Sequence, residues 1–386
     1  MNWKAQSINP WLWVLVHRLY QRYRWCDARH PFWYFYQHWK THRDVLINDF
    51  IHGRYHVLPM MGYNADGHCE PRCSYQDALF QKILYRIIKP TFKNIISPAC
   101  RHLSGPSVIK KVTHELVDAL SQCDYRYMIR TDIRSYYASI ENALLQSMIR
   151  KHFDDANVVR YLCNFVDVPI DRGGWYEHPK KGIPIGSSLS CFFAALVLKP
   201  LDQCFDNRDD LYYCRYNDDI IILCKTKRQY TQAKRRLNTI IMALKLKMAP
   251  KKTRMGSIEK GFHFLGIQFA VARTTASSSR KDRSLTSVDV SLHPRSIRRS
   301  IDKVKLKQEE ERVLKGTCSL SAEPPAYVQS KRYQWAQGWA RQHEQLRDCT
   351  SHITAWNAMA VRMHHHGLSV GHNEQSGFFQ LILRPV

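Results

Sequence analysis

The sequence predicts an α+β fold in which a small antiparallel sheet is surrounded by helices. Two strand-like runs, 211–215 and 220–224, are rich in β-branched and aromatic residues and are separated by a short polar turn. A third strand is predicted over 125–131, and a helical pattern follows it. Towards the C-terminus, the spacing of apolar residues predicts helices over 296–314 and 326–344.

The turn of the predicted hairpin contains two adjacent carboxylates. Asp218 and Asp219 follow Asn217, and an Asn-Asp pair suits a tight turn. Two acids at the tip of an apolar hairpin are unfavourable unless their charge has a use, and we expect that use to be binding divalent metal ions. A Tyr-x-Asp-Asp string alone is more often a solvated turn, so the interpretation requires a third carboxylate from another strand.

Asp132 is that third carboxylate, because it ends the predicted strand 125–131. A helix is expected shortly after it. We expect Ser139 to cap this helix and Glu141 to lie in its first turn. The apolar residues that repeat along its buried side are Ile140, Leu144, Leu145, Met148 and Ile149.

These segments resemble the conserved blocks of reverse transcriptases, and they occur in that family's order. Residues 132–140 and 216–219 resemble its two catalytic blocks. Residues 181–190 are similar to its Gly-Pro-x-Gly block, 245–253 to its Lys-Thr block, and 261–266 to the Phe-Leu-Gly hairpin at the base of its thumb.

The resemblance extends upstream, where residues 49–55, 74–79 and 100–111 are similar to the fingers of prokaryotic enzymes. The similar enzymes are the stand-alone kind related to group II introns and retrons, some of which serve in phage defence. The resemblance implies a right-hand polymerase with fingers, a palm containing an antiparallel sheet, and a helical thumb. The implied parts are an aromatic and basic helical extension (1–60), mainly helical fingers (61–125, with part of 150–185), a palm (126–272), a polar basic loop (273–290) and a helical thumb (291–386).

The resemblance also implies the reaction, which is nucleotidyl transfer with two Mg²⁺ ions, or Mn²⁺ in their place. Magnesium prefers oxygen ligands. The implied ligands are Asp132, the backbone carbonyl of Ile133, and Asp218. Asp219 is expected to tune and partly share the metals, with a purely structural turn acid as the alternative. Lys252 is expected to approach the triphosphate as a charge or proton donor.

The nucleotide-binding residues are likewise implied by the resemblance. Tyr137 stands where the family places a ring that excludes the ribose 2′-hydroxyl, whereas Tyr136 is expected in the core, on the opposite side of an extended backbone. Other implied positions are Gly182, Pro184 and Gly186, for close backbone approach, and Ser187 or Ser188, for capping the next helix. Ile185 occupies a position often filled by Gln, and Asn217 replaces a commoner small residue. Arg101, Lys110 and Lys111 are candidates for contacts with the triphosphate or template, although a solvated surface charge explains each equally well.

Composition independently predicts a polyanionic partner. The chain has 58 Lys and Arg residues against 33 Asp and Glu, a formal net charge of +25. Binding should therefore weaken steeply with salt. The start of the chain is rich in Trp and Arg, and Val14, Leu15 and Leu19 predict an amphipathic helix there. Packing against the fingers and a surface for RNA or self-association both remain open for this region.

The chain is expected to be cytoplasmic and to make no membrane contact. No apolar run is long enough to span a bilayer, and no signal-peptide cleavage pattern begins the chain. Cys191, Cys214 and Cys224 fall in strand-like runs, which suits buried, reduced thiols. His68, Cys69 and Cys73 lack a matching second pair, so a structural explanation is favoured over zinc. The His run 364–366 is more typical of a basic surface.

The function expected from the resemblance is RNA-directed DNA polymerase. The partners would be dNTPs, an RNA template or small non-coding RNA, and the DNA product, with a companion protein or a second copy of the chain also open. The lack of a maturase or nuclease module is typical of retron-type or antiviral enzymes. Two alternatives are kept. The first is the same fold making untemplated, repetitive or protein-primed DNA, and the second is a catalytically idle RNA-binding scaffold.

Overall fold

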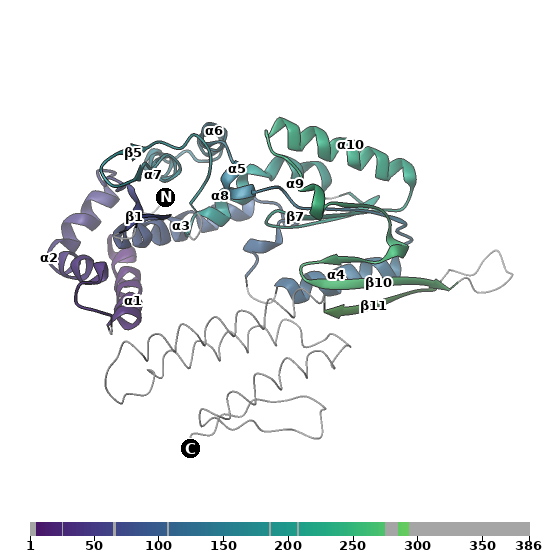
Figure 1. Cartoon of the computed structure of the whole chain (residues 1–386), viewed down its shortest axis with the longest axis horizontal. Helices are drawn as coiled ribbons and strands as arrows, with labels where there is room; N and C mark the ends of the chain where they lie inside the picture. The colour runs from purple at the N-terminus through teal and green to yellow at the C-terminus, as the bar shows by residue number, and fades with distance from the viewer. Residues whose placement is uncertain are drawn as a thin grey trace, which may run out of the picture. The chain divides into compact units, whose positions relative to one another are not determined.

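A computed structural model describes residues 5–24, 26–64, 67–105, 108–184, 187–206, 208–274 and 285–292 (Figure 1). Internal contacts divide the chain into two units. The first unit is Met1–Gly105 with Tyr127–Met255, and the second is Pro106–Arg126 with Gly256–Val386. The three candidate acids all belong to the first unit. The predicted thumb helices lie outside the described residues, and the predicted division into fingers, palm and thumb stays a prediction.

The first unit contains most of the described helices and strands. Its helices are α1 (Ala5–Tyr23), α2 (Pro31–Ile51), α3 (Tyr75–Ile95), α5 (Tyr136–Ser139), α6 (Asn142–His152), α7 (Ala156–Val166), α8 (Ser190–Val197), α9 (Lys199–Phe205) and α10 (Lys227–Ala243), with 3-10 turns η1 (Arg101–Leu103) and η2 (Pro250–Lys252). Its strands are β1 (Met60–Asn64), β2 (Gly67–Arg72), β3 (Tyr127–Thr131), β4 (Ile170–Asp171), β5 (Tyr176–Glu177), β6 (Leu211–Tyr216), β7 (Asp219–Cys224) and the start of β8 (Arg254–Ser257).

The predicted hairpin and the third strand form one antiparallel sheet, in the order β6-β7-β3-β8. Tyr216 pairs with Asp219 next to the turn, which confirms the hairpin. β7 also pairs with β3 in antiparallel register, and Thr131 is opposite Ile220. Because Asp132 follows Thr131 and Asp219 precedes Ile220, both acids lie at the same end of the sheet.

Helices α9 and α10 pack on this sheet. α10 contacts β3 and β7, and α9 contacts β6; Figure 1 shows α9 and α10 beside β7. α10 begins with a capping box, in which the Thr226 side chain accepts from the Gln229 backbone and the Gln229 side chain accepts from the Thr226 backbone. The buried residues on the apolar face of α10 are Ala233, Leu237 and Ile241. α8 is apolar on all sides and is almost wholly buried, as expected for a helix in the core.

The chain after Asp132 differs from the prediction in one respect. Ser135 adopts a left-handed conformation (φ 46°) and starts the short helix α5, so the backbone is not extended there. Ser139 ends α5 and donates to the carbonyls of Arg134 and Ser135, so the predicted cap was wrong. Glu141 is the N-cap of α6 rather than part of its first turn. Tyr136 is buried as expected, and its hydroxyl donates to the Ala194 carbonyl (2.5 Å).

The N-terminal region forms two helices that pack on α3, as the helical prediction required. The buried stripe of α1 is Ile8, Leu12 and Val16, whereas the predicted Val14 is 42% exposed. Most aromatic rings of α2 pack in the core, and Trp39 is only 4% exposed. Packing therefore explains most of this aromatic cluster.

Residues 61–125 are less helical than predicted, because β1 and β2 form a hairpin there. That hairpin belongs to a second sheet of the first unit, with the order β2-β1-β4-β5. α3 follows and is capped by Ser74, whose hydroxyl accepts from the Asp77 backbone. Asp77 is fully buried and accepts from the hydroxyls of Tyr55 and Ser74 (both 2.7 Å). These bonds satisfy a carboxylate that burial would otherwise disfavour.

The second unit contains α4 (Val108–Gln122), η3 (Ile258–Lys260) and the strands β9 (Phe262–Phe264), β10 (Ile267–Thr274) and β11 (Leu285–Leu292). The strands form a sheet of order β11-β10-β9, and α4 contacts β11 (Figure 1). β10 and β11 make an antiparallel hairpin, so the polar loop predicted over 273–290 was too long: 273–274 belong to β10 and 285–290 to β11. Residues 275–284 of that loop lie outside the described residues.

The nine cysteines whose side chains the structure describes are free thiols. Cys214 and Cys224 are buried as expected, but Cys191 is exposed at the start of α8, so the strand and burial predicted for it were wrong. Within the described ranges, none of the helices combines the length and the apolar character needed to cross a bilayer.

Candidate active site

The three acids predicted from the sequence lie together at the end of the β3–β7 pair. The pKa of Asp219 is raised to about 6, mainly by burial; the charge of Arg130 lowers it, and the charges of Asp132 and Asp218 add to the rise. Burial, followed by the charge of Asp132, also raises the pKa of Asp218. Each of these carboxylates therefore lies within the electrostatic field of the others. Such a cluster favours binding of cations.

Two basic side chains partly compensate these acids. Lys252 Nζ lies 2.7 Å from Asp132 Oδ2, and Arg130 Nη2 lies 3.4 Å from Asp219 Oδ1. Arg130 also donates from Nη1 to the carbonyl of Lys252 (2.8 Å). The Lys252 side chain is 59% exposed, whereas that of Arg130 is 10% exposed. Lys252 is therefore the more accessible of the two bases, and Arg130 is the more enclosed.

Residues 247–253 are attached to the chain on both sides of Asp132. The Ala249 amide donates to the Asp132 carbonyl (2.8 Å), and the Arg134 amide donates to the Lys247 carbonyl (2.8 Å). The hydroxyls of Thr131 and Thr253 are 2.7 Å apart. This main-chain pairing explains how a lysine far along the sequence reaches the first acid.

The donor chemistry of the cluster fits Mg²⁺, because carboxylate and carbonyl oxygens are its preferred protein ligands. Among the described side chains, however, no group of three or more His, Cys, Asp or Glu is arranged so that it could hold a metal ion. The acids are instead directed to separate partners: Asp132 to Lys252, Asp218 to Asn217 and Asp219 to Arg130. Two ions would thus require Asp132 to exchange Lys252 for metal.

Tyr137 is linked through Asn217 to the turn that contains Asp218. Its hydroxyl donates to Asn217 Oδ1 (3.1 Å), and Asn217 Nδ2 donates to Asp218 Oδ1 (3.0 Å). Burial, followed by the nearby Cys191 thiol, raises the pKa of Tyr137, so its hydroxyl stays protonated at neutral pH. The ring predicted to select the sugar is therefore placed beside a predicted metal ligand.

Of the remaining predicted site residues, Ile133 directly follows Asp132, is buried and forms an antiparallel β-bridge with Met248. Arg101 lies in η1. Lys110 and Lys111 lie on α4 of the second unit, so their contacts with triphosphate or template stay predictions.

The Gly-Pro-x-Gly block is described only in part. Ile185 and Gly186 lie outside the described residues, while Gly182 adopts a positive φ of 101° that favours glycine. Ser187 accepts from the Leu189 amide one turn before α8, whose N-cap is Leu189, so neither serine caps the helix as predicted.

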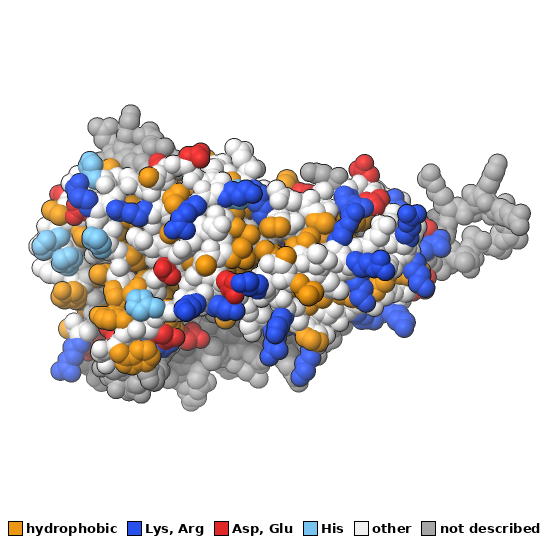
Figure 2. Space-filling model, turned by 90° about the horizontal axis from the view of Figure 1, so that it is seen from above, with side chains coloured by type: hydrophobic (Ala, Val, Ile, Leu, Met, Phe, Trp, Pro, Cys, Tyr) orange, Lys and Arg blue, Asp and Glu red, His pale blue; other side chains and the backbone are white. Residues whose placement is uncertain are grey.

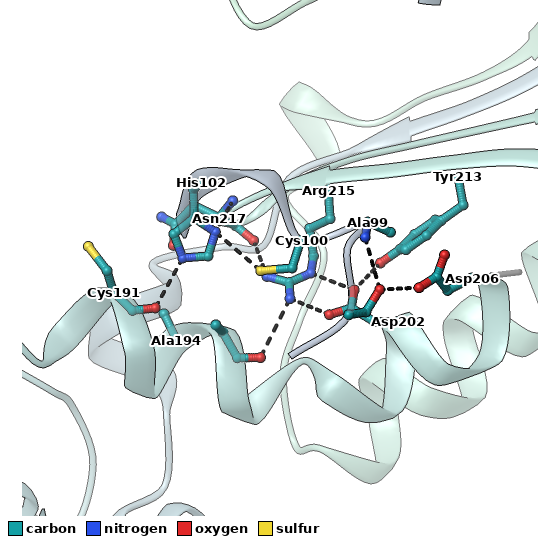
Figure 3. Close-up of polar contacts among 12 residues, drawn as sticks. Ala99, Cys100, His102, Cys191, Ala194, Asp202, Asp206, Tyr213, Arg215 and Asn217 are labelled. Carbon is teal, nitrogen blue, oxygen red and sulfur yellow. Dashed lines mark hydrogen bonds and ion pairs between the residues drawn. The ribbon is translucent and has the colours of Figure 1, made fainter. Parts of the chain in front are cut away.

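Sequence reasoning missed the residues behind the turn, shown in Figure 3. Arg215 is fully buried in β6 and forms an ion pair with Asp202 of α9, to which Tyr213 also donates (2.6 Å). On the other side, the His102 ring accepts from the Asn217 amide (3.2 Å). A charged residue inside the apolar run 211–216 was the available signal, because a buried guanidinium requires a partner.

Comparison with known families gives a match over about half of the chain. Residues 72–269 match the family described as reverse transcriptase (RNA-dependent DNA polymerase). The matched region contains all three acids, Tyr137, Asn217 and Lys252. Among curated proteins, the chain is similar to Protein YkfC of Escherichia coli (strain K12), with 22% identity over 265 residues, covering 58% of this chain and 69% of that protein.

Solved structures with similarity to the chain include telomerases. One is apo telomerase from Candida tropicalis truncated from its C-terminal domain, with a TM-score of 0.41, 13% identity, and coverage of 55% of this chain and 45% of that one. Another is telomerase from Candida tropicalis in complex with the TWJ fragment of telomeric RNA, with a TM-score of 0.40, 16% identity, and coverage of 60% and 47%. The chain thus spans about half the length of these solved chains.

Proposed function

Because the chain belongs to the reverse transcriptase family, we propose that it is an RNA-directed DNA polymerase that extends a primer with two divalent metal ions, magnesium or manganese. Family membership confirms the α+β, right-hand polymerase fold class expected from the sequence. The observation that supports the activity best is the meeting of Asp132, Asp218 and Asp219 at one end of the β3–β7 pair.

In this proposal, Asp132 and Asp218 hold the metal ions, with the Ile133 carbonyl as a further oxygen ligand and Asp219 as the acid that tunes them. The bound ions would lower the pKa of the primer hydroxyl and neutralise the triphosphate. Lys252 neutralises Asp132 before substrate binds. If Asp132 held metal ions instead, the exposed side chain of Lys252 would be able to contact the triphosphate.

Tyr137 would select deoxynucleotides in this site. Its ring is half-buried and its hydroxyl is held by Asn217, which leaves it little freedom to move away from a ribose 2′-hydroxyl. Arg101 and Lys110 are retained as candidate contacts to the triphosphate or template on the family resemblance alone.

The charge of the chain supports a nucleic-acid partner. The net charge of +25 favours a polyanion, and Figure 2 shows Lys and Arg side chains spread across one face while Asp and Glu occupy fewer places. Binding of template and primer should therefore weaken as salt rises, because neutralising phosphates releases counterions.

Primer extension on an RNA template with Mg²⁺ tests the proposal. The wild-type chain should incorporate dNTPs, and Asp218→Asn should lose incorporation by about a thousandfold or more while keeping its affinity for the template–primer. Asp210→Asn is the matched control, since Asp210 pairs with Arg208 at the far end of the same hairpin. Retained synthesis by Asp218→Asn would exclude this site as the polymerase centre.

The finer function rests on family resemblance. We propose that the template is a small partner RNA and that the enzyme serves in phage defence. Sequencing the nucleic acids that co-purify with the chain, and comparing phage growth on cells with wild-type and Asp218→Asn enzyme, tests both. Product sequence distinguishes templated from untemplated synthesis, DNA covalently attached to protein would indicate protein priming, and synthesis by neither enzyme would indicate an idle scaffold.

A further inference from the structure

The carbonyl side of the catalytic turn is fixed by Arg215. This side chain is fully buried and donates to Asp202 from both Nε (2.8 Å) and Nη2. The Tyr213 hydroxyl donates to the same carboxylate (2.6 Å), so the acid has no need of further partners. The remaining nitrogen, Nη1, donates to the carbonyl oxygen of Asn217 (3.0 Å). A rigid, compensated ion pair therefore holds one end of the turn residue.

The amide side of the same residue is held by His102. Cys100 forms a parallel bridge with Arg215, and the Arg215 amide donates to the Ala99 carbonyl (3.0 Å). Two residues further along each segment, His102 lies beside Asn217. The Asn217 amide donates to His102 Nδ1 (3.2 Å), and Figure 3 shows the ring between the turn and α8.

The hydrogen bonds identify which nitrogen of His102 carries the proton. Nε2 lies 3.0 Å from the carbonyl oxygen of Cys191, which can only accept. Nε2 is therefore the donor, and the lone pair of Nδ1 is free to accept from Asn217. Burial lowers the pKa of His102 to about 4, which agrees with a neutral ring at neutral pH.

The conformation of Asn217 determines the positions of Tyr137 and Asp218. Its φ of 57° is left-handed, a region that side chains enter rarely and that Asn tolerates better than most residues. Its side chain bonds the Tyr137 hydroxyl and the Asp218 carboxylate at once. A rotation of its main chain would displace the sugar-selecting ring and a metal ligand together.

We propose that His102 and Arg215 are positioning residues for nucleotidyl transfer, which hold the amide and the carbonyl of Asn217 so that Asp218 and Tyr137 face the reacting groups. This rests on the proposed function, since the acids must be the reaction centre for their positioning to matter. Among the described contacts, neither residue bonds directly to Asp132, Asp218 or Asp219. Both act through the main chain of the turn, and His102 brings this support from η1.

Two variants of His102 separate its two bonds. In His102→Asn, the side-chain oxygen lies where Nδ1 was and can still accept from Asn217. In His102→Gln, the longer amide reaches towards the Cys191 carbonyl but offers no acceptor at the turn. Single-nucleotide incorporation at saturating dNTP should stay within about threefold of wild type in the Asn variant and fall roughly ten- to a hundredfold in the Gln variant. Affinity for the template–primer and the melting temperature should be similar in both.

Hydrogen exchange at the Asn217 amide measures the strength of its hydrogen bond to His102 and does not require an active enzyme. Exchange should be slow in wild type and in His102→Asn, and faster by about tenfold or more in His102→Gln. These relative exchange rates would support the positioning role of His102 even if the wild-type chain failed to extend primers. That failure would contradict only the proposed function. Equal rates and equal exchange in the two variants, or a larger loss in the Asn variant, would overturn the inference.

Discussion

The hairpin β6–β7 lies between two charged clusters of opposite character. At its tip, two basic partners among the described residues pair with Asp132, Asp218 and Asp219, and one of them, Lys252, is more than half exposed. Behind it, Asp202 and Arg215 are one acid and one base, both with fully buried side chains. The first cluster has excess negative charge that a cation can neutralise, whereas the second is compensated and excludes water.

This difference separates the chemistry of the site from its support. A set of carboxylates that is only partly compensated is unfavourable for folding but can exchange its partners for ligands. A buried ion pair cannot exchange partners, because removing either member leaves a charge without solvent. The hairpin thus combines a reactive end with a rigid base. Substitutions in the first cluster should reduce activity, and substitutions in the second should reduce stability.

The largest contrast is expected when one acid in each cluster is replaced by its amide. Asp132→Asn should reduce incorporation by about a thousandfold or more with little change in stability, because it removes a metal ligand. Asp202→Asn should instead destabilise the fold by about 3–5 kcal/mol, because it leaves Arg215 buried and unpaired. Incorporation assays and urea unfolding measure the two effects. Equal loss of stability in both variants would contradict the distinction.

A double substitution sharpens the comparison. Replacing the pair by apolar side chains, Asp202→Leu with Arg215→Met, should recover most of the stability lost in Asp202→Asn, to within about 1–2 kcal/mol of wild type. Incorporation should not recover, because Met cannot donate to the Asn217 carbonyl. Recovery of both properties would mean that Arg215 serves stability alone.

A smaller effect is expected at Tyr137, whose hydroxyl bonds Asn217 in the turn. Tyr137→Ala should increase ribonucleotide incorporation relative to deoxynucleotide by roughly ten- to a hundredfold, because it removes the ring expected to exclude the 2′-hydroxyl. Tyr137→Phe keeps the ring and loses only the bond to Asn217, so it is the matched control and should keep most of the discrimination. Unchanged sugar selection in the Ala variant would refute the gating role.

The smallest effect concerns stability and pH at Asp219. Its pKa is raised to about 6 in the folded chain, so wild-type stability should fall as pH rises from about 4 to 6, where only the folded state still binds the proton. Asp219→Asn cannot ionise at this position, so it avoids this loss of stability. It should be more stable than wild type by about 1–2 kcal/mol above pH 6 and equally stable below pH 4. Urea unfolding at pH 4 and pH 8 measures it. A variant that is less stable at pH 8 would show that the pair with Arg130 dominates.

Sequence patterns predicted the local parts of this site and missed the parts made by tertiary packing. The hairpin and its acids were predicted because strand alternation and turn chemistry are local, and Asp132 followed from the end of a third strand. Ser139 was assigned wrongly, because the left-handed Ser135 starts a short helix that no periodicity reveals. His102 and Asp202 were missed, because their partners come from other elements and nothing near them in the sequence distinguishes them.

The most direct test of the central claim is binding of Mn²⁺ to the chain, measured by electron paramagnetic resonance or calorimetry. Wild type should bind Mn²⁺, and Asp132→Asn combined with Asp218→Asn should weaken that binding at least about tenfold, whereas Asp210→Asn should not. Equal binding by wild type and the double variant would mean that these carboxylates do not hold the ions, which contradicts the account.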